Sequence, residues 1–264
     1  GSPLLKIETS IDWQERHVLV KAAFPLNLEA DCATYETPAG VIQRPTQPES
    51  DREKAQWEVP AMQWADLGDD TYGVSLLNDC KYGYDCQPNQ IRLTLLRGSE
   101  WPNPEADRGH HHFTYALYPH AGSWQVAQTV RHGYELNRSL SVVQVPAQHP
   151  TQGTLPAQGQ FLHLGAENLI LTALKPAEDR PDQWILRGYE CHGRQAELNF
   201  QSDLPLELQH PVDLLEQSPG AVEQSAPTIT IQPWQVVSLA IAQTRNPQSI
   251  TGLVEPEEPT SQGD

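Results

Sequence analysis

Residues 72–97 read YGVSLLNDCKYGYDCQPNQIRLTLLR, two short apolar runs separated by residues typical of turns. The first run, Tyr72–Asp79, and the second, Ile91–Arg97, have the length and composition of strands. Gly, Asn, Asp and Pro, which favour turns, lie between them. This stretch therefore predicts β-structure, and much of the chain repeats its pattern.

Similar runs lie on both sides of this stretch. The 23 Pro residues make long helices unfavourable, because proline disrupts the helix interior. In no window of about a dozen residues do the apolar residues recur with a convincing helical period. The sequence therefore predicts an all-β fold. Besides the two runs above, we expect strands at 17–24, 113–119, 140–146, 168–177, 183–190, 196–202 and 228–242.

The segment between Pro146 and Gln160 is poor in apolar residues and contains three Pro, two Gly and four Gln. Such a composition is typical of a linker or a long loop. Beyond Arg245 the chain has acidic residues but no Lys or Arg, and we expect it to be mobile. We predict a large β-domain over 1–150, a linker over 151–160, a smaller β-domain over 161–245 and an acidic flexible tail over 246–264.

The net charge of −17 excludes several classes of partner. Binding to nucleic acid requires clustered Lys and Arg to neutralise phosphates, and an anionic membrane surface requires the same. No apolar stretch approaches the roughly 20 residues that span a bilayer. We therefore expect no nucleic-acid partner and no membrane, whereas a neutral ligand such as a sugar is permitted.

The four cysteines, Cys32, Cys80, Cys86 and Cys191, form no CxxC pair, and their spacing fits no common zinc site. Free thiols in a reducing compartment, one disulfide and a metal site are the three alternatives. Free thiols fit best, and they predict a cytoplasmic protein.

The densest polar and aromatic region runs from Asn78 to His120. Loops of this composition at strand ends often contact ligands. Arg97 closes an apolar strand, so it can either pair with Asp107 or Glu105 to fix the loop or donate hydrogen bonds to a ligand. Tyr82, with Tyr84 two residues on, can stack on a sugar ring or hold its own loop.

Other chemistry in this region has simpler interpretations. Asp79, Asp85, Glu105 and Asp107 could include a glycosidase carboxylate pair, but acidic residues are abundant in the whole chain. The run His110–His112 could bind metal with Asp107 or His120, although hydrogen bonds to nearby backbone are more typical of such histidines. No GxSxG, Walker, HExxH or GxGxxG motif occurs. Six of the tryptophans are expected in the core or against a sheet: Trp13, Trp57, Trp64, Trp124, Trp184 and Trp234.

Several blocks together resemble the C-terminal part of family 38 α-mannosidases of the bacterial and cytosolic type. The most specific are NDCKYGYD, residues 78–85, and LLRGSEWPNPEADRGHHHFTYALYPH, residues 95–120. The segments 35–46 and 53–67, ERHVLVKAAFPL near the start and WILRGYECHG, residues 184–193, fit the same pattern. The resemblance covers about residues 11–245.

The resemblance implies a large galactose-mutarotase-like β-sandwich followed by a smaller β-sandwich. It implies a retaining exo-mannosidase whose zinc or similar divalent metal, nucleophile and general acid lie in an N-terminal catalytic domain outside this chain. We therefore expect no catalytic or metal-ligating residue here and no hydrolysis by this chain alone. The resemblance assigns Arg97 to the substrate site and places Asp79, Tyr82 and Asp107 beside it.

The partners implied are α-mannosides and the N-terminal catalytic and helical domains of the same protein. Without those domains, we expect an apolar outer face to be exposed, and such a face would permit a homo-oligomer. The alternatives are a stand-alone carbohydrate-binding module, which requires exposed aromatic side chains, and a structural β-sandwich in which Arg97 only braces its loop. A weaker alternative is a mutarotase-like epimerase, which requires a His and a Glu that face each other in a cleft.

Overall fold

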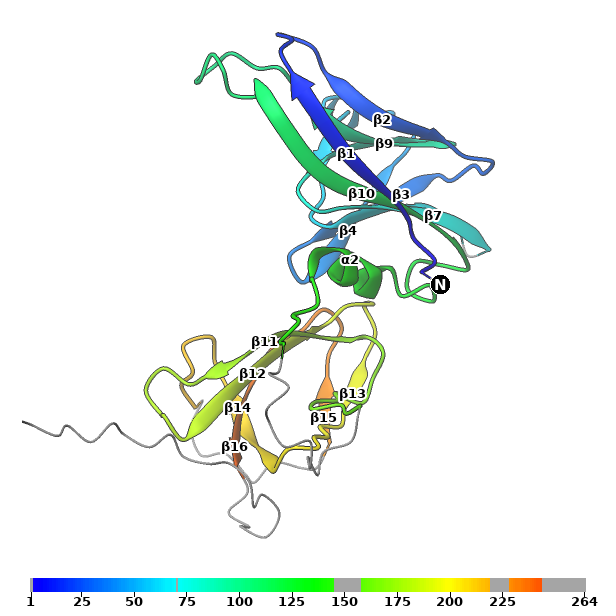
Figure 1. Ribbon diagram of the computed structural model, residues 1–264. Coiled ribbons are helices and arrows are strands. Elements are labelled where there is room, and N and C mark those ends of the chain that lie inside the picture. Colours follow the sequence, from blue (N-terminus) through cyan, green and yellow to red (C-terminus); the bar gives the residue numbers. More distant parts are fainter. Residues whose placement is uncertain (1, 70, 145–157, 219–227, 244–264) are drawn as a thin grey trace, which may run out of the picture. The chain divides into compact units, whose positions relative to one another are not determined.

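The computed structural model describes residues 2–69, 71–144, 158–218 and 228–243 (Figure 1). The chain divides into two compact units. The first consists of residues 1–154 together with 189–196 and 232–235, and the second of 155–188, 197–231 and 236–264. The domain limits given above remain a prediction. The linker falls outside the described residues except for 158–160, and the acidic tail lies wholly outside them.

The first unit is a sandwich of two antiparallel sheets. A six-stranded sheet has the order β1-β10-β7-β6-β3-β4, and a four-stranded sheet has the order β2-β9-β8-β5. The bounds in the larger sheet are β1 Leu5–Trp13, β3 Cys32–Thr37, β4 Gly40–Pro45, β6 Trp64–Gly68, β7 Tyr72–Asn78 and β10 Gly109–Ala121. Those in the smaller sheet are β2 Val20–Pro25, β5 Val59–Pro60, β8 Gly83–Gln87 and β9 Gln90–Leu96.

The core of this unit lies between its two sheets. Alternate residues of each strand point inward, as the twofold period of a strand requires. Tyr35 and Leu67 belong to the larger sheet, and Tyr84 and Leu93 to the smaller one, and all four are buried in one cluster. The outer faces of both sheets are therefore available for polar residues.

Two helices accompany the first unit. The short helix α1 (Asp51–Lys54) begins with a capping box in which Ser50 and Glu53 bind each other's backbone N–H groups. The helix α2 (Thr129–Asn137) contacts β6 and β7. No helix among the described residues is long and apolar enough to cross a membrane.

The second unit contains a four-stranded sheet of order β11-β12-β16-β14 and a two-stranded sheet, β13-β15. Its core includes Ile185, Val212 and Ala240. The bounds are β11 Leu169–Pro176, β12 Gln183–Glu190, β13 Ala196–Leu198, β14 Leu206–Val212, β15 Ile229–Ile231 and β16 Val236–Gln243.

The predicted all-β fold is confirmed, with two corrections. The strand expected at 140–146 is wrong over 140–144, where the chain forms no strand and Leu140 is 94 % exposed, while 145–146 lie outside the described residues. The single strand expected at 228–242 is two, because the turn at Pro233 and Trp234, where Trp234 has a positive φ, separates β15 from β16.

Candidate functional site

A cavity of about 1210 Å³ opens on the first unit. Its floor includes the outer-facing residues Gly83 and Thr94 of the smaller sheet. Its wall is formed by the segment that follows Asn78 and by the loop that follows β9. Arg97, Tyr82 and Asp107, three of the four predicted site residues, line this cavity.

Asp107 holds the two ends of the loop after β9 together. The backbone N–H groups of Arg97 and Gly98 donate hydrogen bonds to Asp107 Oδ2 at 3.1 and 2.8 Å. Gly98 has a φ of +59°, and a Cβ there would lie 3.2 Å from the backbone N of His17, so glycine is required. The loop is thus braced through the backbone of Arg97 and the carboxylate of Asp107.

The Arg97 side chain is left for another role. Arg97 is exposed, and within the described residues its guanidinium has no hydrogen bond or ion pair with protein. The alternative pairing with Glu105 is wrong in this structure, because Glu105 lies 3.4 Å from Arg108 instead. Arg97 therefore presents a free cation at the edge of the cavity.

The segment after β7 places Tyr82 in the cavity and turns Asp79 elsewhere. Asp79 is absent from the lining, and its Oδ2 accepts a hydrogen bond from the N–H of Thr114 at 2.8 Å. Asn78 Oδ1 accepts one from the N–H of Lys81 at 2.7 Å, which fixes the turn. Asp79 thus fastens this segment to β10 while Tyr82, 56 % exposed, faces the cavity.

Lys81 is a site residue that the sequence analysis missed. It lines the cavity beside Tyr82, and its ammonium lies 4.3 Å from the centre of the Phe113 ring. Such a cation–π contact positions the charge without neutralising it. The available signal was a cation inside NDCKYGYD, between a turn and an exposed aromatic residue.

Exposed aromatic side chains line the cavity. Trp57 is 60 % exposed and Trp101 is 86 % exposed, and both line the cavity with Tyr82. The expectation that Trp57 packs in the core or on a sheet is wrong, because the ring lies on the surface, 5.2 Å from the Lys21 ammonium. Flat faces beside hydrogen-bonding groups suit a sugar ring, which has apolar C–H faces and polar hydroxyl edges.

The carboxylates of the region are all occupied by protein partners. Asp85 is buried and ion-paired with Lys21 and Arg92. Glu58 lies 3.3 Å from Lys21, and Glu100, on the loop after β9, is held by Arg16 and His17 at 2.9 and 2.8 Å. With Asp79 and Asp107 bound as described, this arrangement favours binding over acid–base catalysis.

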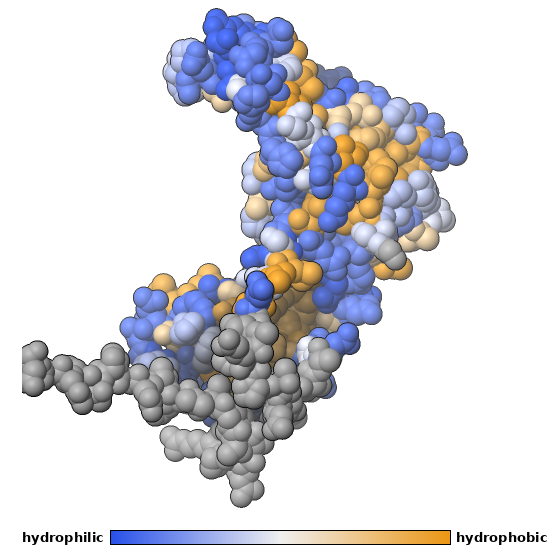
Figure 2. Space-filling view, viewed as in Figure 1, coloured by the Kyte–Doolittle hydropathy of each residue, from blue (hydrophilic) through white to orange (hydrophobic). Residues whose placement is uncertain are grey.

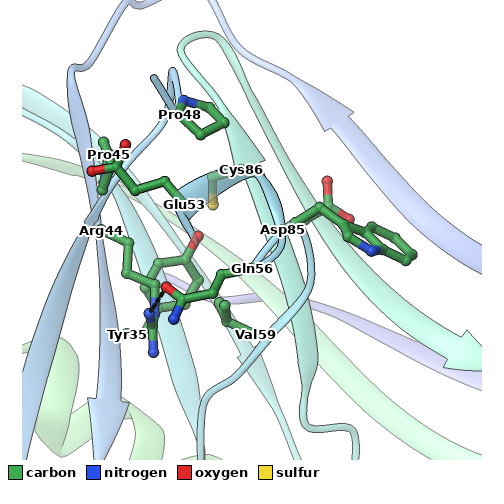
Figure 3. A pocket seen from close by; sticks show the side chains of 10 residues that line it. Tyr35, Arg44, Pro45, Pro48, Glu53, Gln56, Val59, Asp85 and Cys86 are labelled. Atoms are coloured by element: carbon green, nitrogen blue, oxygen red, sulfur yellow. Dashed lines mark hydrogen bonds between the residues drawn. The ribbon is translucent and has the colours of Figure 1, made fainter. Parts of the chain in front are cut away.

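A second, much smaller cavity of about 60 Å³ shares Trp57 and Val59 with the large one. Figure 3 shows Arg44 Nη1 donating a hydrogen bond to Gln56 Oε1 at 2.8 Å beside Tyr35. Burial raises the pKa of the neighbouring Cys86 thiol to about 12, so the thiol is neutral. This space holds about two water molecules and does not form a ligand site of its own.

The thiols and histidines have structural surroundings. All four cysteines are free, as the first of the three alternatives expected for the thiols, while the reducing compartment stays a prediction. His111 Nε2 lies 2.7 Å from the carbonyl oxygen of Asp107, a backbone contact of the kind expected for this run. No cluster of three His, Cys, Asp or Glu side chains suited to a metal ion occurs in the part of the chain that the structure describes.

Two family descriptions match this chain. "Glycosyl hydrolases family 38 C-terminal domain" matches residues 1–105, and "Glycosyl hydrolases family 38 C-terminal beta sandwich domain" matches residues 168–239. The chain belongs to glycosyl hydrolase family 38. Within that family it comprises C-terminal β-domains, as the resemblance predicted.

Relatives of this family 38 chain are much longer than the chain itself. It is 35 % identical to alpha-mannosidase 2C1 of Homo sapiens over 247 residues, which is 91 % of this chain and 23 % of the relative. It is 35 % identical to alpha-mannosidase G of Dictyostelium discoideum over 204 residues, which is 77 % of this chain and 18 % of the relative. The chain thus spans about a quarter or less of these relatives.

Solved structures show the same fold. The crystal structure of an alpha-mannosidase from Enterococcus faecalis V583 matches with a TM-score of 0.75 at 20 % identity. The match covers 90 % of this chain and 27 % of that one. The folds of these β-domains therefore also occur within a larger protein.

Proposed function

We propose that this chain is the C-terminal β part of a retaining α-mannosidase that hydrolyses non-reducing terminal α-mannosyl residues. The observation that carries the proposal is the cavity, in which the free Arg97 guanidinium lies with Lys81 and exposed aromatic rings on a family 38 scaffold. The cavity forms one wall of the substrate site, and the catalytic domain of the same protein forms the rest.

The chemistry is divided between the parts of the enzyme. Glycoside hydrolysis with retention needs a carboxylate nucleophile and an acid at defined separation. The carboxylates around this cavity are bound to protein groups, so the reacting carboxylates belong to the catalytic domain. Zinc or a similar divalent ion belongs there too, because the described residues offer no ligand cluster that fits it. Arg97 positions the sugar by donating hydrogen bonds to its hydroxyl groups.

The surface around the cavity supports docking of the catalytic and helical domains. Val18, Leu19, Trp57, Tyr82 and Trp101 are exposed, and four of these five residues line the cavity. Figure 2 shows a band of hydrophobic residues across the visible face of the first unit, between more hydrophilic regions. Such surface is covered in the complete enzyme, and it permits self-association of the isolated chain. The free thiols support a cytoplasmic location.

The test is the variant Arg97→Ala in the complete enzyme. Losing a charged hydrogen-bond donor to the sugar lowers kcat/KM by about 10- to 100-fold. The midpoint of thermal unfolding stays unchanged, because the guanidinium has no partner among the described residues. Arg52→Ala, on the exposed surface of α1, is the matched control and keeps full activity. Equal kinetics for Arg97→Ala and wild type would contradict the proposal.

The exposed aromatic residues favour a second candidate, a carbohydrate-binding module that works without other domains. Trp57, Tyr82 and Trp101 meet its requirement for exposed rings. Calorimetric titration of the isolated chain with methyl α-mannoside separates the two. Binding that is lost in Tyr82→Ala favours the module, and no binding until the catalytic domain is present favours the proposed enzyme.

A further inference from the structure

A separate cavity of about 210 Å³ lies on the outer face of the six-stranded sheet. Its base is a row of side chains that are direct neighbours across three strands, because Gln43 pairs with Thr34 and Thr34 with Asp66. The next pairing, of Asp66 with Ser75, extends the row under α2, where Ser75 Oγ meets Thr129 Oγ1 at 2.8 Å. The row is thus covered by the helix at one end and open at the other.

Most residues around the open end are polar. Ser123 and Gln125, from the segment before α2, face the row across the cavity, and Trp124 forms part of the wall. The lining includes no Lys or Arg among the described residues. A phosphate or carboxylate ligand therefore finds no opposite charge here.

Asp66 supplies a buried acceptor to this cavity. It is 5 % exposed, and its Oδ2 already binds Ser75 Oγ at 2.6 Å and His120 Nε2 at 2.8 Å. His120 Nδ1 lies 3.1 Å from the carbonyl oxygen of Gly122, so both ring nitrogens have acceptors. Both contacts of Asp66 use Oδ2, and Asp66 Oδ1 has no hydrogen bond within the described part of the chain. The carboxylate can therefore accept a hydrogen bond from a ligand through Oδ1.

Thr34 points to a missing ligand. Its side chain is 6 % exposed and lines the cavity, and its hydroxyl makes no hydrogen bond to any of the described residues. The hydroxyl is not among the fully buried atoms without a partner, so water reaches it in the empty cavity. An apolar occupant would exclude that water and leave the hydroxyl without a partner. Gln43, Ser123 and Gln125 likewise have no side-chain hydrogen bonds within the described part of the chain.

We propose that this cavity binds a neutral sugar of one ring, held by Thr34, Gln43, Asp66, Ser123 and Gln125. Hydroxyl groups that both donate and accept match the amides, the hydroxyls and the carboxylates of Asp66 and Asp69 in this lining. The volume equals about seven water molecules, which is enough for a single pyranose. The site lies on the opposite face of the sandwich from the Arg97 cavity, and it does not depend on the proposed mannosidase function.

Cys32 offers a local reporter, because it is exposed and lines the same cavity. In a Cys80→Ser background it is the remaining exposed thiol, since Cys86 is partly buried and Cys191 buried. We would measure the rate at which an aromatic disulfide reagent modifies Cys32 in the full chain. The probes are D-mannose, D-glucose and D-galactose at increasing concentration.

At least one of these sugars slows the modification saturably, with a dissociation constant in the millimolar range. Thr34→Val, which removes only the hydroxyl, raises that constant by about 3- to 10-fold, and Thr34→Ser preserves it. Gln43→Leu, at the exposed rim, also raises the dissociation constant, so the result does not rest on one variant. Arg97→Ala leaves the dissociation constant unchanged.

Three outcomes would overturn the proposal. The first is that no sugar slows the modification of Cys32. The second is that Thr34→Val and Gln43→Leu both keep the wild-type dissociation constant. The third is that Arg97→Ala abolishes the protection of Cys32. The last outcome would assign the bound sugar to the large cavity and support the mannosidase site instead.

Discussion

At the scale of single residues, the backbone and the side chain of Arg97 have different surroundings. The N–H group is bound by Asp107, whereas the guanidinium extends to the cavity without a protein partner. From the sequence, the Arg97 side chain could either brace the loop or bind a ligand. The structure assigns bracing to Asp107, so the two tasks can be tested separately.

Asp107→Ala removes the acceptor of two backbone hydrogen bonds, one of them from the buried Gly98. We expect the free energy of unfolding to fall by about 1–3 kcal/mol, because two N–H groups lose their partner. Urea unfolding of the isolated chain measures this. Asp107→Asn retains an acceptor oxygen and serves as the control, with a smaller loss. Equal stability of Asp107→Ala and wild type would refute the bracing role.

Glu36 is a buried carboxyl whose protonation affects stability. Burial raises its pKa from 4.5 to about 7, although the N–H of Gln63 donates a hydrogen bond to Oε2 at 2.6 Å. Between these two pH values the unfolded chain releases the proton and the folded chain retains it. The native state therefore loses stability as pH rises through this window, by on the order of 3 kcal/mol.

Glu36→Gln removes this dependence, since the amide does not titrate. We expect its free energy of unfolding to exceed that of wild type at pH 8 and to approach it at pH 5. Urea unfolding at both pH values measures the difference. Glu8→Gln, an exposed substitution on β1, keeps the wild-type profile. Parallel pH profiles for wild type and Glu36→Gln would show that the carboxyl ionises freely in the folded protein.

At the scale of elements, the success of a strand prediction depends on how its residues alternate and what lies beside it. The run 183–190 coincides with β12, and 72–79 differs from β7 by one residue. The run 140–146 had the same apolar content, but over 140–144 no strand pairs with it. Pairing partners lie far away in sequence, so local composition alone cannot supply them.

The helix α2 was missed for a related reason. Its N-cap, Gln128, has a left-handed backbone and makes no side-chain capping bond, so the usual start signal is absent. Its position is set instead by contacts with β6 and β7. Similarly, Lys81 and Trp57 become site residues only because several separate segments of the chain meet at one cavity. The sequence motifs therefore indicate the region of the site, whereas the fold determines which side chains line the cavity.

Gly73 shows how closely two elements of the larger sheet approach. A Cβ at this position would lie 2.6 Å from Cε1 of His120, whose ring is fixed by Asp66 and Gly122. We expect Gly73→Ala to lower the free energy of unfolding by about 1–3 kcal/mol through overpacking. Thermal and urea unfolding measure it. Gly40→Ala meets nothing closer than 3.5 Å and is the matched control, and an equal effect of both would contradict this packing argument.

At the scale of the whole molecule, the proposed function divides the substrate site between this chain and the rest of a longer protein. The large cavity offers cations and aromatic rings, but its carboxylates are engaged and its described residues hold no metal cluster. The human relative is about four times as long as its aligned part. If the proposed function holds, binding and bond cleavage are performed by different parts of one protein, and separating those parts should abolish turnover.

The final prediction tests this separation by reconstitution. The isolated chain hydrolyses no p-nitrophenyl α-mannoside, and co-expression with the remainder of the enzyme restores hydrolysis, because exposed apolar surface beside the cavity drives assembly. The Arg97→Ala chain co-purifies equally with the remainder but supports turnover reduced by about 10- to 100-fold. Co-purification and initial rates are measured on the same preparations. Hydrolysis by the isolated chain that survives chelator and repurification, or a remainder that is equally active alone, would show that this β part does not complete the site.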